Sequence, residues 1–227
     1  MTRLFGLDIL STTVRIPAGD IELEGLLCIP DGARAIVAFA QGRGSSRTNA
    51  VDTYLAAELQ HHGVATLLLD MYTPSELDED TQDAHLRFNV RMLGDRLTAV
   101  ADWLMNNPST HHMVAGLMGA STGAAAALIA AGNRPEAINV IVCWAGRPDL
   151  AGDALRYVHS PTLLLVGEND HLVYSLNEFA IDQMTHVRKL IPVANAGHEF
   201  QELGALEHLA DQACQWFNTY LTPNRAM

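Results

Sequence analysis

Residues 113–130 read MVAGLMGASTGAAAALIA, which is an apolar run, a loop of small residues and a second run rich in alanine. The first run has the length of a buried strand, and the last has the composition of a helix. Between them, GASTG at 119–123 matches the pattern G-x-S-x-G. Small residues on both sides let a strand and a helix approach closely while the serine occupies a sharp, strained turn. We therefore expect a tight turn at Ser121, followed by a helix whose positive N-terminal end points toward the serine hydroxyl.

The rest of the chain alternates short apolar runs with amphipathic segments of helix length. Strands are expected at Ala35–Ala40, Val64–Leu69, Met113–Met118, Ile138–Val142, Thr162–Val166 and Val187–Val193, and helices at Ala50–His61, Ala84–Asn106, Gly123–Ala131, Leu172–Met184 and Leu203–Tyr220. A hairpin with its turn at Pro17–Asp20 precedes them. Continuous apolar strands need cover on both faces, so we expect an α/β fold in three layers, with helices on both sides of a mostly parallel sheet. The loops after the strands should then carry the chemistry.

Composition and charge narrow the class of protein. Hydrophobic residues make up 48% of the 227 residues and no linker-like stretch divides them, so we expect a single domain over residues 1–227. The formal net charge is −12, without a basic cluster, which argues against a nucleic-acid partner. No apolar run reaches the roughly 18 residues of a membrane span, and the three cysteines lack metal-ligand spacing. We expect a cytoplasmic protein that needs no metal or other cofactor; the sequence is also compatible with a homodimer.

The longest insertion between an expected strand and an expected helix is Tyr72–Gln82. Acidic residues concentrate at Glu76–Asp83 within and just beyond it. Charge runs are usually solvated, so the acidic run predicts a solvated loop and the start of a helix without a role of its own. The insertion is too short for a large lid. We therefore expect a fairly open site, with a minimal lid or none, that suits small or short-chain substrates.

An acidic side chain follows a later strand. The expected strand Thr162–Val166 runs into GEND at 167–170, which puts Asp170 where a carboxylate would orient a catalytic histidine. Asp and Asn are also common turn residues, so the position alone does not decide the role. Glu168 and Asp149 remain alternatives for the same carboxylate.

The histidine that best fits a general base is His198. It follows the last expected strand in a loop with a glycine on one side, whereas the other histidines lie at element ends or within polar helical segments. His171 is a weaker rival, because it neighbours the candidate acid in the same turn. A serine, a histidine and a carboxylate together activate a serine hydroxyl for attack on a carbonyl.

The loop after Ala35–Ala40 reads QGRGSSR at 41–47. A loop in this place supplies one backbone amide to an oxyanion hole, and the residue after the nucleophile supplies the other. The expected donors are the backbone N–H groups of Arg43 and Thr122. The side chains of Arg43 and Arg47 are candidates for contact with an acidic substrate. The same glycines match a phosphate-binding loop only in part.

Four motifs together resemble the α/β-hydrolase superfamily over nearly the whole chain. They are QGRGSS at 41–46, GASTG at 119–123, GEND at 167–170 and GH at 197–198. Their order along the chain, serine then acid then histidine, is the order of that superfamily. The resemblance implies the α/β-hydrolase fold, with an eight-stranded, mostly parallel sheet.

Three further motifs narrow the resemblance to compact esterases related to dienelactone hydrolases. They are LLLD at 67–70, HLRF at 85–88 and AGRPDL at 145–150. Dienelactone hydrolases themselves usually have a cysteine nucleophile, whereas Ser121 stands at the matching position, which points to ester rather than enol-lactone chemistry.

The residues and the resemblance lead to one main functional expectation. It is a serine hydrolase that cleaves small or short-chain carboxylic esters through Ser121, His198 and Asp170, with an acyl-enzyme intermediate. The alternatives are a thioesterase or lactonase with the same three residues, and a non-catalytic ligand receptor on this fold. A dinucleotide-binding loop at Gly116–Gly123 is disfavoured, because the glycine pattern is missing at the first strand-to-helix turn.

Overall fold

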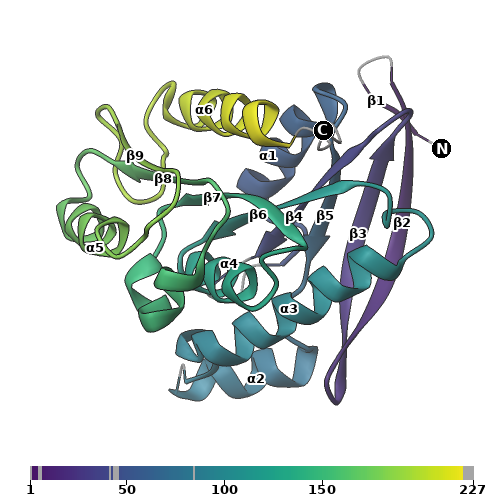
Figure 1. Ribbon diagram of the computed structural model, residues 1–227, viewed down its shortest axis with the longest axis horizontal. Coiled ribbons are helices and arrows are strands. Elements are labelled where there is room, and N and C mark those ends of the chain that lie inside the picture. The colour runs from purple at the N-terminus through teal and green to yellow at the C-terminus, as the bar shows by residue number, and fades with distance from the viewer. Residues whose placement is uncertain (1, 5–6, 41, 43–45, 84, 222–227) are drawn as a thin grey trace.

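The computed structural model describes residues 2–4, 7–40, 42, 46–83 and 85–221, which form one sheet with helices on both faces (Figure 1). The strands are β1 Thr2–Leu4, β2 Leu7–Ala18, β3 Ile21–Pro30, β4 Ala35–Ala40, β5 Ala65–Leu69, β6 Val114–Ala120, β7 Ile138–Trp144, β8 Thr162–Gly167 and β9 Arg188–Val193. The helices are α1 Ala50–His61, α2 Pro74–Asp83, α3 Val90–Asn106, α4 Thr122–Asn133, α5 His171–Ile181 and α6 Ala205–Tyr220, with the 3₁₀ segments η1 Leu86–Phe88 and η2 Pro148–Tyr157.

The sheet has the strand order β1-β2-β3-β5-β4-β6-β7-β8-β9. Neighbouring strands from β5 to β9 are parallel, and β1, β2 and β3 join them through antiparallel pairs. The expected mostly parallel α/β fold is therefore confirmed. The eight expected strands are present as β2 to β9. In the described part of the chain β1 is a ninth strand, whose three residues pair with the start of β2 at one edge. A strand of that length is too short to show the two-residue alternation that predicts strands.

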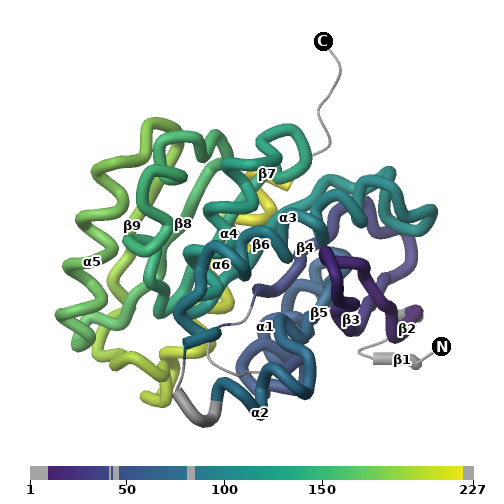
Figure 2. The backbone as a smooth tube through the Cα atoms, turned by 90° about the horizontal axis from the view of Figure 1, so that it is seen from below, coloured from purple at the N-terminus to yellow at the C-terminus, as the bar shows by residue number. Residues whose placement is uncertain are grey.

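Two helical layers cover the sheet. Helices α1 and α6 lie on one face and α3, α4, η2 and α5 on the other (Figure 1). In Figure 2, which views the molecule from below, α5 lies beside β8 and β9 at one end of the sheet. Strands β2 and β3 lie at the other end. On the first face, Leu59 and Phe217 are buried, and on the second Leu93 and Leu97 are buried. No helix in the described ranges is both long enough and apolar enough to cross a bilayer.

The insertion after β5 differs from the expectation of a solvated acidic run. It forms helix α2, in which the side chain of Asp80 is only 3% exposed. Glu76, one turn earlier, pairs with Arg96 of α3, which is itself 8% exposed. The prediction of a solvated run holds for Asp78 and Glu79, which are exposed, and is wrong for Glu76 and Asp80. Those two carboxylates pair with Arg96 and Arg87 and are thereby stabilised away from water.

Two helical segments also differ from the predicted bounds. The helix expected over Ala84–Asn106 begins at Val90, because the Asn89 side chain accepts a hydrogen bond from Met92 N at 3.1 Å and so caps α3. The segment η2 was not predicted; its chain bends at Gly152, where φ is 53°. The expected hairpin is present, with its turn at residues 19–20 between β2 and β3.

Candidate active site

Ser121 occupies the turn between β6 and α4. Its backbone has φ 51° and ψ −126°, a conformation that costs free energy for a residue with a Cβ atom. Two backbone hydrogen bonds hold its carbonyl oxygen, from Ala124 N at 3.2 Å and from Arg147 N at 2.9 Å. The serine is therefore fixed at the N-terminal end of a helix, where the helix dipole stabilises negative charge.

Glycine is required where strand β6 passes under helix α4. A Cβ atom added at Gly119 would lie 2.6 Å from the carbonyl oxygen of Gly123 and 2.7 Å from Ala124 Cα. Both are backbone atoms, which cannot move aside as a flexible side chain can. The absence of a side chain at residue 119 therefore allows the close approach that creates the turn at Ser121.

His198 and Asp170 are hydrogen-bonded to each other. The distance from His198 Nδ1 to Asp170 Oδ2 is 2.6 Å, and the two side chains are 44% and 14% exposed. In the tautomer with the proton on Nδ1, the imidazole donates to the carboxylate and its Nε2 atom is left to accept a proton. The structure thus brings together the acid and the base that the sequence singled out.

The loops that carry these two residues are joined to each other by backbone contacts. Asn169 N donates to Ala196 O at 2.9 Å, and Asn195 N donates to the Glu168 side chain at 3.0 Å. A Cβ atom added at Gly167 would lie 2.3 Å from the carbonyl oxygen of Gly197, so the loops touch where glycine leaves room. The two loops therefore form one braced unit.

The alternative carboxylates have other partners. Glu168 accepts the backbone N–H of Asn195, and Asp149 accepts two hydrogen bonds from the Arg147 guanidinium, both at 2.8 Å. The rival His171 lies at the first position of α5 and lines a separate cavity with Glu168. The geometry therefore favours Asp170 and His198 over these alternatives.

Ser121 and His198 line one cavity of about 280 Å³. Its other lining residues are Thr122, Val173, Arg87, Phe88 and Arg147. The two arginines were not singled out for this site, although each lies in a motif used for the resemblance. Each is already paired with an aspartate, Arg87 with Asp80 and Arg147 with Asp149, so neither adds an unbalanced charge. The hydrogen bonds that Arg147 donates to Asp149 also raise the pKa of Arg147 above its ordinary value.

Of the two expected oxyanion-hole donors, only Thr122 lies within the residues that the structure describes. Thr122 is the first residue of α4 and lines the same cavity as Ser121. Arg43 lies outside the described residues. Gly42 is described, and a Cβ atom there would lie 2.8 Å from Thr122 N. The chain just before residue 43 therefore packs directly against the N-terminus of α4.

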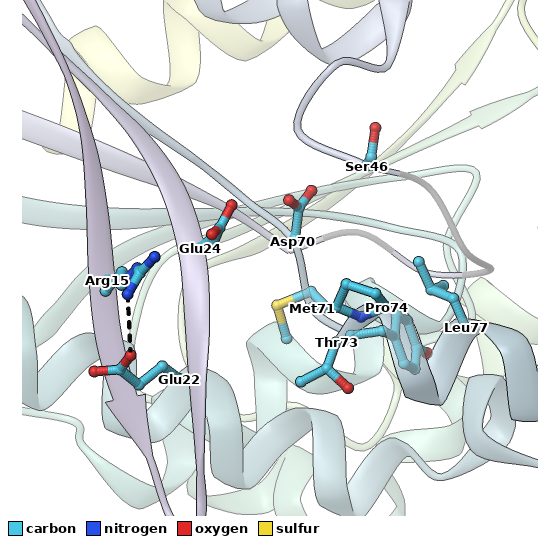
Figure 3. A pocket seen from close by; sticks show the side chains of 10 residues that line it. Arg15, Glu22, Glu24, Ser46, Asp70, Met71, Thr73, Pro74 and Leu77 are labelled. Carbon is cyan, nitrogen blue, oxygen red and sulfur yellow. Dashed lines mark ion pairs between the residues drawn. The ribbon is translucent and has the colours of Figure 1, made fainter.

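A second cavity, of about 310 Å³, lies between the β2–β3 hairpin and the chain after β5 (Figure 3). Asp70 and Glu24 lie beside each other at its edge in that view. Arg47, expected to contact an acidic substrate, instead pairs with both of these carboxylates, with 3.0 Å from Arg47 Nη2 to Glu24 Oε2. Its backbone N–H also donates to Asp70 Oδ1 at 2.7 Å. The Arg47 side chain is thus occupied by internal ion pairs.

Among the described residues, no three His, Cys, Asp or Glu side chains are grouped closely enough to hold a metal ion. Asp170 and His198 approach each other as a pair, and the chemistry open to them is proton transfer at Nε2 of the imidazole.

Comparison with known proteins identifies the relatives of this chain. Residues 23–220 match the model of the Dienelactone hydrolase family. The crystal structure of a dienelactone hydrolase from Anabaena variabilis is 44% identical, covers 94% of this chain and 99% of its own, and has a TM-score of 0.92. A dienelactone hydrolase-like promiscuous phosphotriesterase from metagenomic libraries is 18% identical over 94% of this chain and 99% of its own, with a TM-score of 0.76, which shows a shared fold alone.

Two curated sequences from strains of Mycobacterium tuberculosis carry a different name, "Putative phosphoribosyl transferase". Each is 42% identical over 208 residues, which are 92% of this chain and 46% of theirs. The chain thus spans about half the length of the curated relatives it matches.

Proposed function

The chain belongs to the dienelactone hydrolase family, and on that basis we propose that it is a serine hydrolase that cleaves small carboxylic esters. One observation carries the proposal: a single cavity holds both Ser121, in a strained turn, and His198, which is hydrogen-bonded to Asp170. Acyl transfer needs a nucleophile, a base and a group that orients the base. Serine rather than cysteine at residue 121 favours esters over enol-lactones.

In the proposed reaction, Ser121 Oγ attacks the ester carbonyl carbon while His198 Nε2 takes the hydroxyl proton. The tetrahedral intermediate carries a negative oxygen, which the backbone N–H of Thr122 and that of Arg43 would stabilise. The intermediate collapses, the C–O bond to the alcohol breaks, and the imidazolium returns the proton to the leaving alcohol. Water, deprotonated by the same imidazole, then attacks the acyl-enzyme and releases the acid and free Ser121.

The first test is hydrolysis of p-nitrophenyl acetate, butyrate and octanoate, together with fluorophosphonate labelling mapped by mass spectrometry. We expect the label on Ser121 and a fall in turnover of about 10⁶-fold in Ser121→Ala, as for other serine hydrolases. Ser109→Ala is the matched control, since Ser109 is exposed and outside the cavity, and it should keep full activity. Turnover that survives Ser121→Ala would overturn the proposed nucleophile.

A thioesterase or a lactonase would use the same three residues, so substrate comparison has to separate them. Wild type should prefer oxygen esters to matched thioesters and lactones in kcat/KM. In Ser121→Cys, which introduces the thiol usual for dienelactone hydrolases, the preference should shift away from the oxygen esters. A wild-type preference for the thioester or the lactone would replace the ester proposal with that alternative.

The name of the Mycobacterium tuberculosis relatives suggests phosphoribosyl transfer, but those chains are about twice as long as the matched region. The name belongs to the whole relatives, of which the matched 208 residues are 46%, so it does not decide the function of this chain. A non-catalytic receptor remains the alternative from another class. It would bind small esters without labelling at Ser121 and without turnover.

A further inference from the structure

Asp80, in the acidic helix α2, is buried outside the group of residues that the proposed reaction uses. Its side chain is 3% exposed, and a carboxylate this far from water is stable only with close hydrogen-bond partners. Its side chain accepts hydrogen bonds from two consecutive residues, Leu86 and Arg87. This concentration of contacts on one short segment suggests a specific role for the carboxylate.

The contacts of Asp80 hold the segment η1. Oδ1 accepts the backbone N–H groups of Leu86 at 3.0 Å and Arg87 at 3.1 Å, and Oδ2 accepts Arg87 Nε at 2.6 Å. Arg87 Nη2 also donates to the carbonyl oxygen of Asp80 at 3.1 Å. Burial disfavours the carboxylate, but the hydrogen bonds and charge of Arg87 outweigh it and lower the pKa of Asp80. One ionised side chain thus fixes both the backbone and the side chain of Arg87.

Helix α2 is itself anchored to the core. Arg96 of α3 donates from Nη1 to Met71 O at 2.8 Å and to Glu76 Oε2 at 3.0 Å. Since Arg96 is 8% exposed and α3 packs on the sheet, α2 has a fixed position relative to β5 and α3. Asp80 therefore connects a fixed helix to the segment η1.

The segment that Asp80 holds forms one wall of the candidate catalytic cavity. Arg87 and Phe88 line it together with Ser121 and His198. Phe88 is 60% exposed, so its ring has apolar surface that a bound substrate would remove from water. The position of this ring depends on the backbone that Asp80 holds.

We propose that Asp80 is a positioning residue that fixes Arg87 and Phe88 as the wall of the cavity, and that this wall selects esters whose bulky apolar or aromatic acyl group covers Phe88. This inference rests on the proposed hydrolysis through Ser121. Asp80 acts through η1 and does not touch the reacting atoms. An acetyl group is too small to cover the Phe88 ring, whereas a benzoyl group is large enough to pack on it, so only binding of the benzoyl ester should depend on the position of the wall.

The test compares kcat/KM for p-nitrophenyl benzoate with that for p-nitrophenyl acetate in wild type, Asp80→Asn and Asp80→Ala. Rates are divided by the concentration of fluorophosphonate-labelled sites, so that loss of folded enzyme cancels. We expect the benzoate-to-acetate ratio to fall about 10-fold in Asp80→Ala and less in Asp80→Asn, in the range that single apolar contacts contribute to selectivity. The effect should lie in KM for the benzoate, with kcat for the acetate within about twofold of wild type.

A control uses another aspartate–arginine pair, between Asp102 of α3 and Arg134 at the end of α4. Asp102 accepts two hydrogen bonds from Arg134, at 2.7 and 3.0 Å, and does not line the cavity. Asp102→Ala removes an ion pair that is more exposed than the one at Asp80 and should leave the ratio unchanged. A ratio lowered equally in Asp102→Ala would show that the effect is general destabilisation and would overturn the inference.

Phe88→Ala shows whether Asp80 acts through the wall. The ratio should fall in Phe88→Ala alone, and adding Asp80→Asn should lower it little further, because both changes remove the same interaction. An unchanged ratio in Asp80→Asn, measured per labelled site, would leave Asp80 with a structural role only and overturn the inference. Failure of the proposed function is distinguishable, since wild type itself would then show neither label nor turnover.

Discussion

The loops that carry Ser121, Asp170 and His198 and the α2–η1 segment both border the candidate cavity, but different forces hold them. The three loops are braced by backbone hydrogen bonds and by close contacts at glycines. The α2–η1 segment is held by two carboxylate–arginine pairs, one between residues seven positions apart and one between residues 20 positions apart. Backbone bracing is insensitive to side-chain charge, whereas ion pairs depend on pH and salt. The chemistry and the substrate wall should therefore respond to different perturbations.

Among the changes that test this comparison between the two regions, the largest effect is expected at the proposed acid, Asp170. Asp170→Asn should lower kcat by about 10⁴-fold, as in other serine triads, because the amide favours the wrong tautomer of His198. The measurement is kcat for p-nitrophenyl acetate per labelled site. Glu168→Gln is the matched control, since Glu168 bonds Asn195 N instead, and it should stay within about 10-fold of wild type. A larger loss in Glu168→Gln than in Asp170→Asn would move the role of the acid to Glu168.

The second prediction concerns a substitution that disrupts the close backbone contact between β6 and α4. In Gly119→Ala the new Cβ atom would meet the backbone of Gly123 and Ala124, so strand and helix must separate. A displacement of Ser121 by about 1 Å should cost about 100-fold in kcat, and overpacking should lower the free energy of unfolding by about 1–3 kcal/mol. Urea unfolding and kcat per labelled site measure the two effects.

Gly132→Ala is the control for this change. The atom nearest to its new Cβ would lie 3.3 Å away, so we expect smaller losses of kcat and of unfolding free energy than in Gly119→Ala. Equal effects of the two alanines would contradict the proposed close approach.

The third prediction concerns the ion pairs of the α2–η1 segment. Burial disfavours ionised Glu76, but hydrogen bonds from Arg96 and Thr73 outweigh it and lower its pKa below the ordinary 4.5. A carboxyl group with a lowered folded-state pKa adds stability that is complete above its unfolded pKa and is lost as the pH falls through the folded value. Glu76→Gln should therefore lower the free energy of unfolding by about 1–2 kcal/mol at pH 7.

The pH dependence supplies the check on Glu76. Unfolding free energies of wild type and Glu76→Gln, measured from pH 7 to pH 3, should converge below pH 4.5 as the carboxyl takes up a proton. A difference that stays constant to pH 3 would mean that the charge of Glu76 contributes no stability.

The smallest effect is expected at the pair between Asp102 and Arg134. These side chains are 39% and 37% exposed, so water screens their attraction. Asp102→Asn should change the free energy of unfolding by no more than about 0.5 kcal/mol, and it should lose most of that change at 1 M salt. A loss as large as that of Glu76→Gln would show that burial does not set the strength of these pairs.

The sequence predicts the backbone-braced region well and the ion-paired segment poorly. The bounds of β4 and α1 were predicted to the residue, and the strand, turn and helix around Ser121 were also predicted, because apolar runs and small residues are local signals. Helix α2 has little apolar periodicity and was missed. A local signal for it was present in Thr73 and Glu76, whose side chains each accept the other's backbone N–H, at 3.3 and 2.8 Å, as in a capping box.

The partners of the buried charges could not be predicted from the sequence. Nothing local indicates that Arg96 reaches Glu76, because the two residues meet only when α3 packs beside the end of β5. The place of Arg87 and Phe88 in the cavity wall depends on the same long-range packing. Residue type and spacing indicated the proposed nucleophile, acid and base, whereas the residues of the cavity wall could be named only once the fold was known.

The bracing between the loops after β8 and β9 also determines how the site moves. Asn169 N donates to Ala196 O, so we expect thermal motion to shift Asp170 and His198 together. Ser121 lies in a separate turn, between β6 and α4. We therefore expect fluctuations to change the separation of the serine and the imidazole more than that of the imidazole and its carboxylate.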